Sequence, residues 1–262
     1  MRHIAIVLAA GRGKRMNSNV AKQYLLLRDK PVLYYALNQF EHSFIDDIIL
    51  VTGAEDITYC AEEIVAKYGF TKVRQVVAGG RERYHSVHQG LVAAGKLLQD
   101  EALAGTLRSA VQEADNEVAL TQAAPEVCIY IHDGARPFIS EEILLRARKS
   151  VERYGSGVVG MPVKDTIKIA DESGFAADTP KRSLVWQVQT PQCFLYSEIA
   201  PAYTKLIETE EALLAQGIAI TDDAMVMELL GNRPVKLVEG SYENIKITTP
   251  EDLAVAESFF SK

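Results

Sequence analysis

Short apolar runs rich in β-branched residues alternate along this chain with longer segments whose apolar residues recur every three to four positions. Several short runs are apolar at nearly every position, which is typical of strands covered on both faces. The alternation predicts an α/β fold, with a Rossmann-like, mostly parallel sheet and helices on both faces. The expected strands are Ile4–Leu8, Ile45–Thr52, Lys72–Val77, Val127–Ile131, Gly157–Pro162 and Val235–Val238. The expected helices are Val32–Phe40, Ile57–Tyr68, Tyr84–Leu98, Glu141–Tyr154, Ile199–Ala215, Ala224–Leu230 and a last one that begins at Thr249-Pro250.

Two segments interrupt this alternation. Leu97–Glu126 is rich in Ala, Glu and Gln, and we expect an inserted helical excursion on the surface. Lys164–Trp186 has polar, alternating flanks around the turn Asp171-Glu172-Ser173-Gly174, which predicts an extended β-hairpin arm. Such an arm usually buries its face against a partner subunit, so a homodimer is expected. Because no repeat or linker divides the chain, we expect one domain over residues 1–262.

The overall charge argues against binding through a broad positive surface. Lys plus Arg number 28 and Asp plus Glu number 35, which gives a net charge of −7. A chain this acidic is a poor candidate for a nucleic-acid-binding protein. Apolar residues make up 48% of the chain, too many for disorder, and no run approaches the ~20 apolar residues of a membrane span.

The N-terminal segment and the cysteines indicate a cytoplasmic protein. The apolar run Ile4–Ala10 is short and is followed at once by cations, which favours a buried first strand over a secretory signal. Cys60, Cys128 and Cys193 are odd in number, far apart and without CxxC spacing. This pattern excludes a disulfide framework or a thiolate zinc site and favours buried thiols in a reducing compartment.

The loop after the first strand is the strongest candidate for a phosphate site. It carries glycines and small residues, whose backbone N–H groups can approach a ligand closely. Its cations would neutralise a polyphosphate, although the spacing matches neither the dinucleotide fingerprint nor the P-loop. The residues concerned are Ala9-Ala10-Gly11-Arg12-Gly13-Lys14-Arg15-Met16 and the nearby Lys22. The alternative is a basic loop that is exposed to solvent and binds no ligand.

Two further loops follow expected strands. Gly79-Gly80 permits a tight turn against which a flat base could lie, and Ser86 comes one turn into the next helix. His132-Asp133-Gly134-Ala135-Arg136-Pro137 follows the fourth strand and places a carboxylate where Mg²⁺ could be held against a substrate phosphate. Arg136 could pair with Asp133 or with phosphate. His85 and His88 lack a third ligand at suitable spacing, so we favour a non-metal interpretation.

Taken together, these segments resemble the 2-C-methyl-D-erythritol 4-phosphate cytidylyltransferase family. The resemblance covers nearly the whole chain apart from Leu97–Glu126, and the segments keep the family's order and relative spacing. They are Ala9 to Met16, Lys22-Gln23-Tyr24, Gly79-Gly80-Arg81-Glu82-Arg83 with Ser86, His132 to Pro137, Val163-Lys164-Asp165-Thr166, Trp186 with Gln189-Thr190-Pro191-Gln192, Thr221-Asp222-Asp223-Ala224, and Glu239-Gly240 with Asn244-Ile245-Lys246.

The resemblance implies a cytidylyl transfer. The phosphate of the polyol attacks the α-phosphorus of CTP, pyrophosphate leaves, and a CDP-linked polyol forms on the non-mevalonate route to isoprenoids. This chemistry needs a divalent cation, Mg²⁺, but no protein nucleophile. Catalysis then consists of positioning and of neutralising developing charge.

The resemblance also implies roles for individual residues. Arg15, Lys22, Arg182 and Lys246 are expected to be catalytic. The residues expected to bind CTP are Ala9, Ala10, Gly11, Gly13, Arg15, Lys22, Gly80, Ser86, Asp133 and Ala135. The residues expected to bind the polyol phosphate are Asp133, Arg136, Thr166, Arg182, Thr190, Thr221 and Lys246. Asp133 is the one expected protein ligand of the cation. Thr166 and Arg182 lie on the arm, so the site is expected to be shared across the dimer.

Three alternatives stay open at this point. A ribitol-5-phosphate cytidylyltransferase has closely similar motifs and differs in a few polyol contacts. A nicotinamide-dependent oxidoreductase is remote, because the first loop lacks a third glycine and no acid ~20 residues on offers a ribose contact. A non-catalytic binding protein would not be expected to carry Arg15, Lys22, Asp133, Arg182 and Lys246 together.

Overall fold

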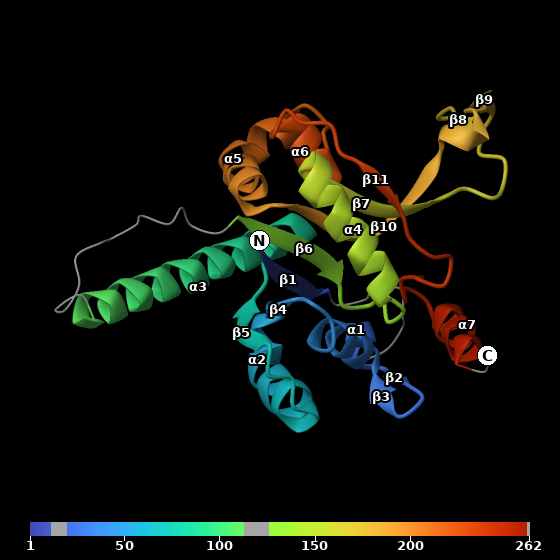
Figure 1. Cartoon of the computed structure of the whole chain (residues 1–262). Helices are drawn as coiled ribbons and strands as arrows, with labels where there is room; N and C mark the ends of the chain where they lie inside the picture. Colours follow the sequence, from blue (N-terminus) through green and yellow to red (C-terminus); the bar gives the residue numbers. More distant parts are fainter. Residues whose placement is uncertain (12–19, 113–125, 261–262) are drawn as a thin grey trace.

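The computed structural model describes residues 1–11, 20–112 and 126–260 of the chain, which form a sheet with helices on both faces (Figure 1). The strands are β1 (Arg2–Ala9), β2 (Leu26–Leu27), β3 (Lys30–Pro31), β4 (Asp47–Thr52), β5 (Val73–Ala78), β6 (Val127–Asp133), β7 (Ser156–Pro162), β8 (Ile169–Ala170), β9 (Ala176–Asp178), β10 (Trp186–Leu195) and β11 (Leu237–Glu239). The α-helices are α1 (Val32–Glu41), α2 (Ile57–Tyr59), α3 (Arg83–Gln112), α4 (Glu141–Tyr154), α5 (Tyr196–Ala215), α6 (Asp223–Leu229) and α7 (Pro250–Phe259). Shorter helical segments are η2 (Lys22–Tyr24), η3 (Ala54–Asp56), η4 (Cys60–Ala66) and η5 (Arg182–Leu184).

Within the described residues the main sheet has seven strands in the order β11-β7-β10-β6-β1-β4-β5. β1 pairs in parallel with β4 and β6, β4 with β5, and β11 with β7. β10 runs antiparallel to both of its neighbours, β6 and β7. The carboxyl ends of β1, β5 and β6 therefore lie at one edge, where ligands of open α/β sheets bind.

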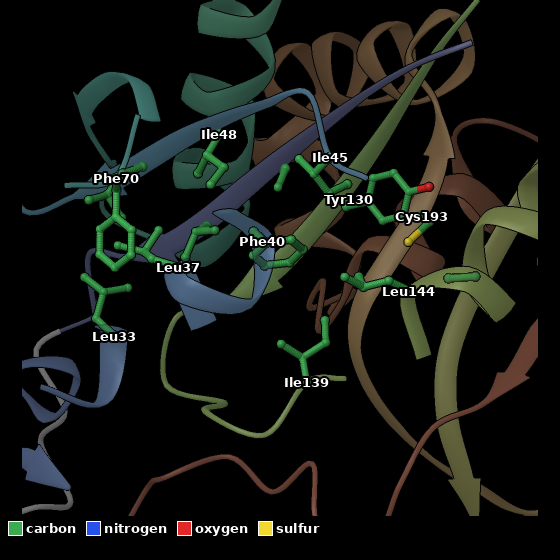
Figure 2. Packing of buried hydrophobic residues seen from close by; sticks show 14 of the residues in the cluster. Leu33, Leu37, Phe40, Ile45, Ile48, Phe70, Tyr130, Ile139, Leu144 and Cys193 are labelled. Atoms are coloured by element: carbon green, nitrogen blue, oxygen red, sulfur yellow. The ribbon is translucent and has the colours of Figure 1, made fainter. Parts of the chain in front are cut away.

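Alternate residues of the strands supply two cores, one on each face. Ala5, Val7 and Ala9 of β1 pack with helices α1, η4 and α4, as Figure 2 shows for residues such as Leu37 and Leu144. Ile4 and Ile6 face the opposite way and pack with α3, α5 and α6. Because the two sets of β1 residues are fully buried, the strand reads as a continuous apolar run.

Helix boundaries follow local signals where these are strong. Ser140 caps α4 by accepting a hydrogen bond from the Ile143 N–H, and Gly155 ends it at φ +77°. Thr249 and Asp252 form a capping box at α7. The α/β fold is confirmed, with a mixed sheet. The helix expected over Ile57–Tyr68 is α2 followed by η4, a π-helix.

The two unusual segments are partly described. α3 continues past Leu98 to Gln112 and extends beyond the sheet (Figure 1), while residues 113–125 of the expected excursion lie outside the described part. In the expected arm, β8 and β9 form an antiparallel hairpin whose turn contains Gly174 at φ +85°. The hairpin projects away from the sheet in Figure 1. No helix within the described ranges is long and apolar enough to span a membrane.

Candidate active site

Two adjoining clefts open at the carboxyl ends of the central strands. The first spans about 640 Å³, part of it open to solvent, and is lined by Leu8, Ala9, Ala10, Gly11, Lys22, Gln23, Gly80, Arg81, Glu82, Arg83, Ser86, Asp133, Ala135 and Lys246. The second spans about 690 Å³, also partly open to solvent, and is lined by Arg83, Asp133, Arg136, Val188, Gln189, Thr190, Gln192, Thr221, Asp222 and Lys246. Arg83, Asp133 and Lys246 line both clefts, so a ligand in either one meets the same three charges.

In the first cleft, backbone and small side chains meet closely. The Gly80 N–H donates to Ser86 Oγ at 3.1 Å. A Cβ at Gly79 would stand 2.6 Å from Ser86 Oγ and 2.7 Å from the Ala10 Cβ, so only glycine fits between the first loop and α3. This packing aligns two backbone segments along one wall of the cleft, and their N–H and C=O groups suit recognition of a flat base.

Lys22 reaches the same cleft from η2, whose position is set by its two neighbours. The buried Gln23 side chain donates to the Ala9 carbonyl at the end of β1. The Tyr24 hydroxyl lies 2.8 Å from Thr52 Oγ1 and 3.2 Å from Cys60 Sγ. Gln23 and Tyr24 thus tie η2 to two strands of the sheet and hold Lys22 at the cleft wall.

Asp133, at the end of β6, is surrounded by cations. Its carboxylate lies 2.8 Å from Lys246 Nζ, 3.3 Å from Arg83 Nε and 3.9 Å from Arg136 Nε. Burial alone would raise the pKa of Asp133, but Arg83, Lys246 and Arg136 together hold that pKa well below its usual range. Asp133 is therefore ionised at neutral pH, with three cationic side chains within 3.9 Å of its carboxylate.

Arg83 forms the best-defined ion pair of the site. Its Nη1 and Nη2 each donate at 2.8 Å to the carboxylate of Asp223, which is fully buried in the first turn of α6. The Tyr203 hydroxyl also donates to Asp223. Arg83 belongs to the motif Gly79-Gly80-Arg81-Glu82-Arg83, but the sequence alone gave it no role. The motif was the signal in the sequence that pointed to Arg83. The partner of Arg83, Asp223, lies 140 residues further along the chain.

Nearly all residues that line the second cleft have polar or charged side chains. Pairing of β10 with β7 is interrupted between Val188 and Gln192, and Gln189 and Thr190 lie in that interval. Gln189 Nε2 donates to the Ser241 carbonyl, and the buried Asn244 donates to the Thr190 carbonyl. These bonds hold the interrupted part of β10 against the segment that carries Lys246.

Most of the expected site residues come together at these clefts. Ala9, Ala10, Gly11, Lys22, Gly80, Ser86, Asp133, Ala135 and Lys246 line the first, and Arg136, Thr190 and Thr221 line the second. Thr166 and Arg182 are exposed and line neither cleft of the chain, and Arg182 Nη1 donates to the Lys164 carbonyl at 3.2 Å. Gly13 and Arg15 lie outside the described residues. Arg136 Nε lies 3.9 Å from Asp133, one of the two partners considered for it, and Arg136 also donates to the Asn244 carbonyl at 2.7 Å.

Among the described residues, few protein groups at the clefts are suited to hold a metal ion. Over the ranges that the structure describes, no three His, Cys, Asp or Glu side chains gather as a metal cage. Instead, His85 Nε2 bonds to Glu210 Oε2 at 2.9 Å. Mg²⁺ commonly uses one or two carboxylates together with substrate phosphates, so Asp133, in the wall of both clefts, could supply the protein ligand of a cation that arrives with its nucleotide.

Comparison with known proteins identifies related sequences over the whole length. A sequence model of the family "2-C-methyl-D-erythritol 4-phosphate cytidylyltransferase" matches residues 3–114 and 104–262. A protein of that name from Lachnoclostridium phytofermentans is 45% identical over 254 residues, which cover 97% of this chain and 94% of the relative. Another from Clostridium botulinum (strain 657 / Type Ba4) is 43% identical over 258 residues and covers 98% and 96%.

Solved structures give the same picture. The crystal structure of 4-diphosphocytidyl-2C-methyl-D-erythritol synthase from Anaerococcus prevotii DSM 20548 superposes with a TM-score of 0.74 at 30% identity. The match covers 100% of this chain and 96% of that one. A structure from Thermus thermophilus matches with a TM-score of 0.67 at 24% identity over 98% of both chains, a likeness of fold.

Proposed function

The chain belongs to the 2-C-methyl-D-erythritol 4-phosphate cytidylyltransferase family, and from this membership we propose how its clefts carry out cytidylyl transfer. The first cleft binds CTP, the second binds 2-C-methyl-D-erythritol 4-phosphate, and the cations between them hold the reacting phosphates. The observation that carries this assignment is the set Arg83, Asp133 and Lys246, which lines both clefts. Two phosphate-bearing substrates bound side by side would meet there.

The reaction needs position and charge more than chemical groups from the protein. An oxygen of the polyol phosphate attacks the α-phosphorus of CTP, the bond from that phosphorus to the bridging oxygen breaks, and pyrophosphate leaves with the electron pair. Negative charge shifts toward the pyrophosphate during the step. Fixed cations at Lys22 and Lys246 stabilise that charge without reorganising, as preorganised donors do.

On the nucleotide side, the roles are divided between backbone and side chains. The walls formed by Ala9, Ala10 and Gly11 and by Gly80, Ser86 and Ala135 receive the cytidine. Lys22 contacts the triphosphate, and Arg15 and Gly13 belong to the same phosphate-binding loop. The close approach at Gly79 supports this division, because it packs the turn before Gly80 against Ala10 and Ser86, which line the first cleft.

On the acceptor side, Lys246 and Arg136 bind the phosphate, and Thr190 and Thr221 contact the polyol. The arm supplies Thr166 and Arg182 to the site of a partner subunit, which makes the enzyme a homodimer. The exposure of apolar side chains on the arm supports this assembly, since Phe175 is 74% and Leu184 is 75% exposed. Sedimentation should give a dimer, and a fully active monomer would contradict the shared site.

A divalent cation, Mg²⁺, is part of this proposal. Asp133 would hold it together with the phosphate oxygens of CTP, and the cation would supply further neutralisation of the triphosphate. Family membership favours a cation of this kind. The three free, buried cysteines support a reducing compartment, and we assign the chain to the cytoplasm.

The test is pyrophosphate release from CTP with each of two acceptors, 2-C-methyl-D-erythritol 4-phosphate and ribitol 5-phosphate. The methylerythritol acceptor should be used far better, and EDTA should abolish release. Lys246→Met should lower kcat/KM by about 100-fold or more, the loss typical of one positioned charge donor. The matched control is Lys236→Met, a lysine that stacks on Tyr154 away from both clefts. Preference for ribitol 5-phosphate, or equal activity of the two variants, would overturn the proposal.

A further inference from the structure

His132 is a buried histidine beside the site to which the proposed reaction gives no task. It is fully buried in β6, and its ring packs edge-on against Phe40 with 5.3 Å between ring centroids. Its ring nitrogens bond to a carbonyl and a hydroxyl, not to a carboxylate, and full burial favours the uncharged imidazole. A neutral imidazole carries one N–H donor and one acceptor nitrogen, and its surroundings decide which is which.

The two hydrogen bonds of the His132 ring favour one tautomer. Nε2 lies 3.2 Å from the Arg136 carbonyl oxygen, which can only accept, so Nε2 must carry the proton. Nδ1 is then unprotonated and can only accept. Its partner is Thr190 Oγ1 at 3.1 Å, so the Thr190 hydroxyl donates its single proton to His132.

The Thr190 hydroxyl therefore has no further proton to donate to a ligand. Its oxygen also accepts a hydrogen bond from the Asp133 N–H at 3.1 Å. A hydroxyl has one proton and two lone pairs, so one lone pair is left. Thr190 is only 3% exposed, and what remains open to a ligand lies in the acceptor-side cleft.

We propose that His132 fixes Thr190 as a hydrogen-bond acceptor toward the bound substrate, so that Thr190 recognises a hydroxyl of the polyol and not an oxygen of its phosphate. This deepens the proposed function and rests on it. An ionised phosphate has no proton to give, and two facing acceptors repel. His132 is thus a positioning residue, and through Thr190 it helps to specify a hydroxyl-bearing acceptor.

Fluorinated acceptor substrates test the direction of this hydrogen bond, because fluorine is close to a hydroxyl in size but cannot donate a hydrogen bond. Each free hydroxyl of 2-C-methyl-D-erythritol 4-phosphate is replaced by fluorine in turn, and kcat/KM is compared with that of the parent compound. For one analogue, the wild-type enzyme should discriminate by about 10- to 100-fold, since a buried acceptor is left unsatisfied. In Thr190→Val, discrimination against that analogue should fall to within about threefold, whereas Thr190→Ser, which keeps the hydroxyl, should retain it.

His132→Phe separates the positioning role from general damage. The ring shape suits the contact with Phe40, but the nitrogen that holds the Thr190 proton is gone. The freed hydroxyl can then turn and donate to fluorine, so discrimination should fall about tenfold. Because the ratio compares two acceptors on one enzyme, a loss of folded protein cancels from it.

A second measurement does not depend on the variants. The ¹⁵N chemical shifts of the two His132 nitrogens in labelled wild-type protein, between pH 6 and 8, should identify Nδ1 as unprotonated and Nε2 as protonated. The opposite assignment overturns the inference, as does turnover with unchanged discrimination in both Thr190→Val and His132→Phe. If the enzyme does not turn over CTP with the polyol phosphate at all, the proposed function fails and the inference fails with it.

Discussion

The ion pair between Arg83 and Asp223 makes a quantitative prediction about stability. Asp223 has no exposed side-chain surface, whereas the Arg83 side chain is 28% exposed. In the variant Asp223→Asn, the Arg83 guanidinium keeps its charge and its largely buried position. Asp133, at 3.3 Å, is then its nearest carboxylate. Removing one partner of a buried pair typically lowers the free energy of unfolding by 3–5 kcal/mol. Because Arg83 is partly exposed and Asp133 remains, we expect about 3 kcal/mol.

The assay is urea unfolding at pH 7.5, followed by far-UV circular dichroism, for wild type, Asp223→Asn, Arg83→Gln and the double variant. The single variant Asp223→Asn should also lower Tm by roughly 6–12 °C. The double variant should lose about 2 kcal/mol less than the sum of the single losses, because two neutral amides leave no unpaired charge.

An ion pair on the surface supplies the control for this double-mutant cycle. Arg148 and Glu152 form an i,i+4 pair at 2.7 Å with both side chains about 40% exposed. Glu152→Gln should change the free energy of unfolding by about 0.5 kcal/mol or less. If Asp223→Asn loses under 1 kcal/mol, or if the losses of the two single variants simply add, the buried pair does not stabilise the fold as its burial implies.

The remaining predictions concern the nucleotide side and pH. Lys22→Ala should lower kcat by about 100-fold, with the exposed Lys67→Ala as an unaffected control, and a loss below twofold would contradict the role of Lys22. Glu210 accepts hydrogen bonds from Tyr84 and Arg81 beside the base-binding loop, so Glu210→Gln should raise KM for CTP several-fold with little change in kcat, unlike the exposed Glu208→Gln. The pKa of His132 is lowered from 6.5 to about 4 in the folded protein. As the pH falls, His132 therefore becomes protonated in the unfolded chain before it does in the folded one. The free energy of unfolding should therefore fall by up to about 3 kcal/mol from pH 6.5 to pH 4, and His132→Phe should show a shallower fall; parallel curves would refute this.

Local patterns were sufficient for the central strands and several helices. β1 is apolar at nearly every position because helices cover it on both faces, so a short, continuous apolar run followed by a glycine-containing loop was enough to predict it. α4 begins at a serine cap and ends at a left-handed glycine, both visible in the sequence. The clefts could also be anticipated, because parallel strands bring their carboxyl ends to one edge.

β10 was missed for a physical reason. Its first three residues are exposed or half-buried, Pro191 lies within it, and the sequence pattern predicts the end of the arm at Trp186, where the structure begins a strand. Its insertion between β6 and β7 depends on pairing with strands far away in the sequence. No local period encodes that choice of neighbours.

The sequence by itself determined the alternation of strands and helices, the family resemblance, and which loops carry the charges. It did so because strand periodicity, capping and motif spacing are local properties of the chain. Only the tertiary structure decided what those side chains bind. It paired Arg83 with Asp223, surrounded Asp133 with cations, and brought Thr190 Oγ1 within 3.1 Å of His132 Nδ1. Each of these contacts joins distant segments, and the direction of a hydrogen bond depends on every partner that the fold brings within reach.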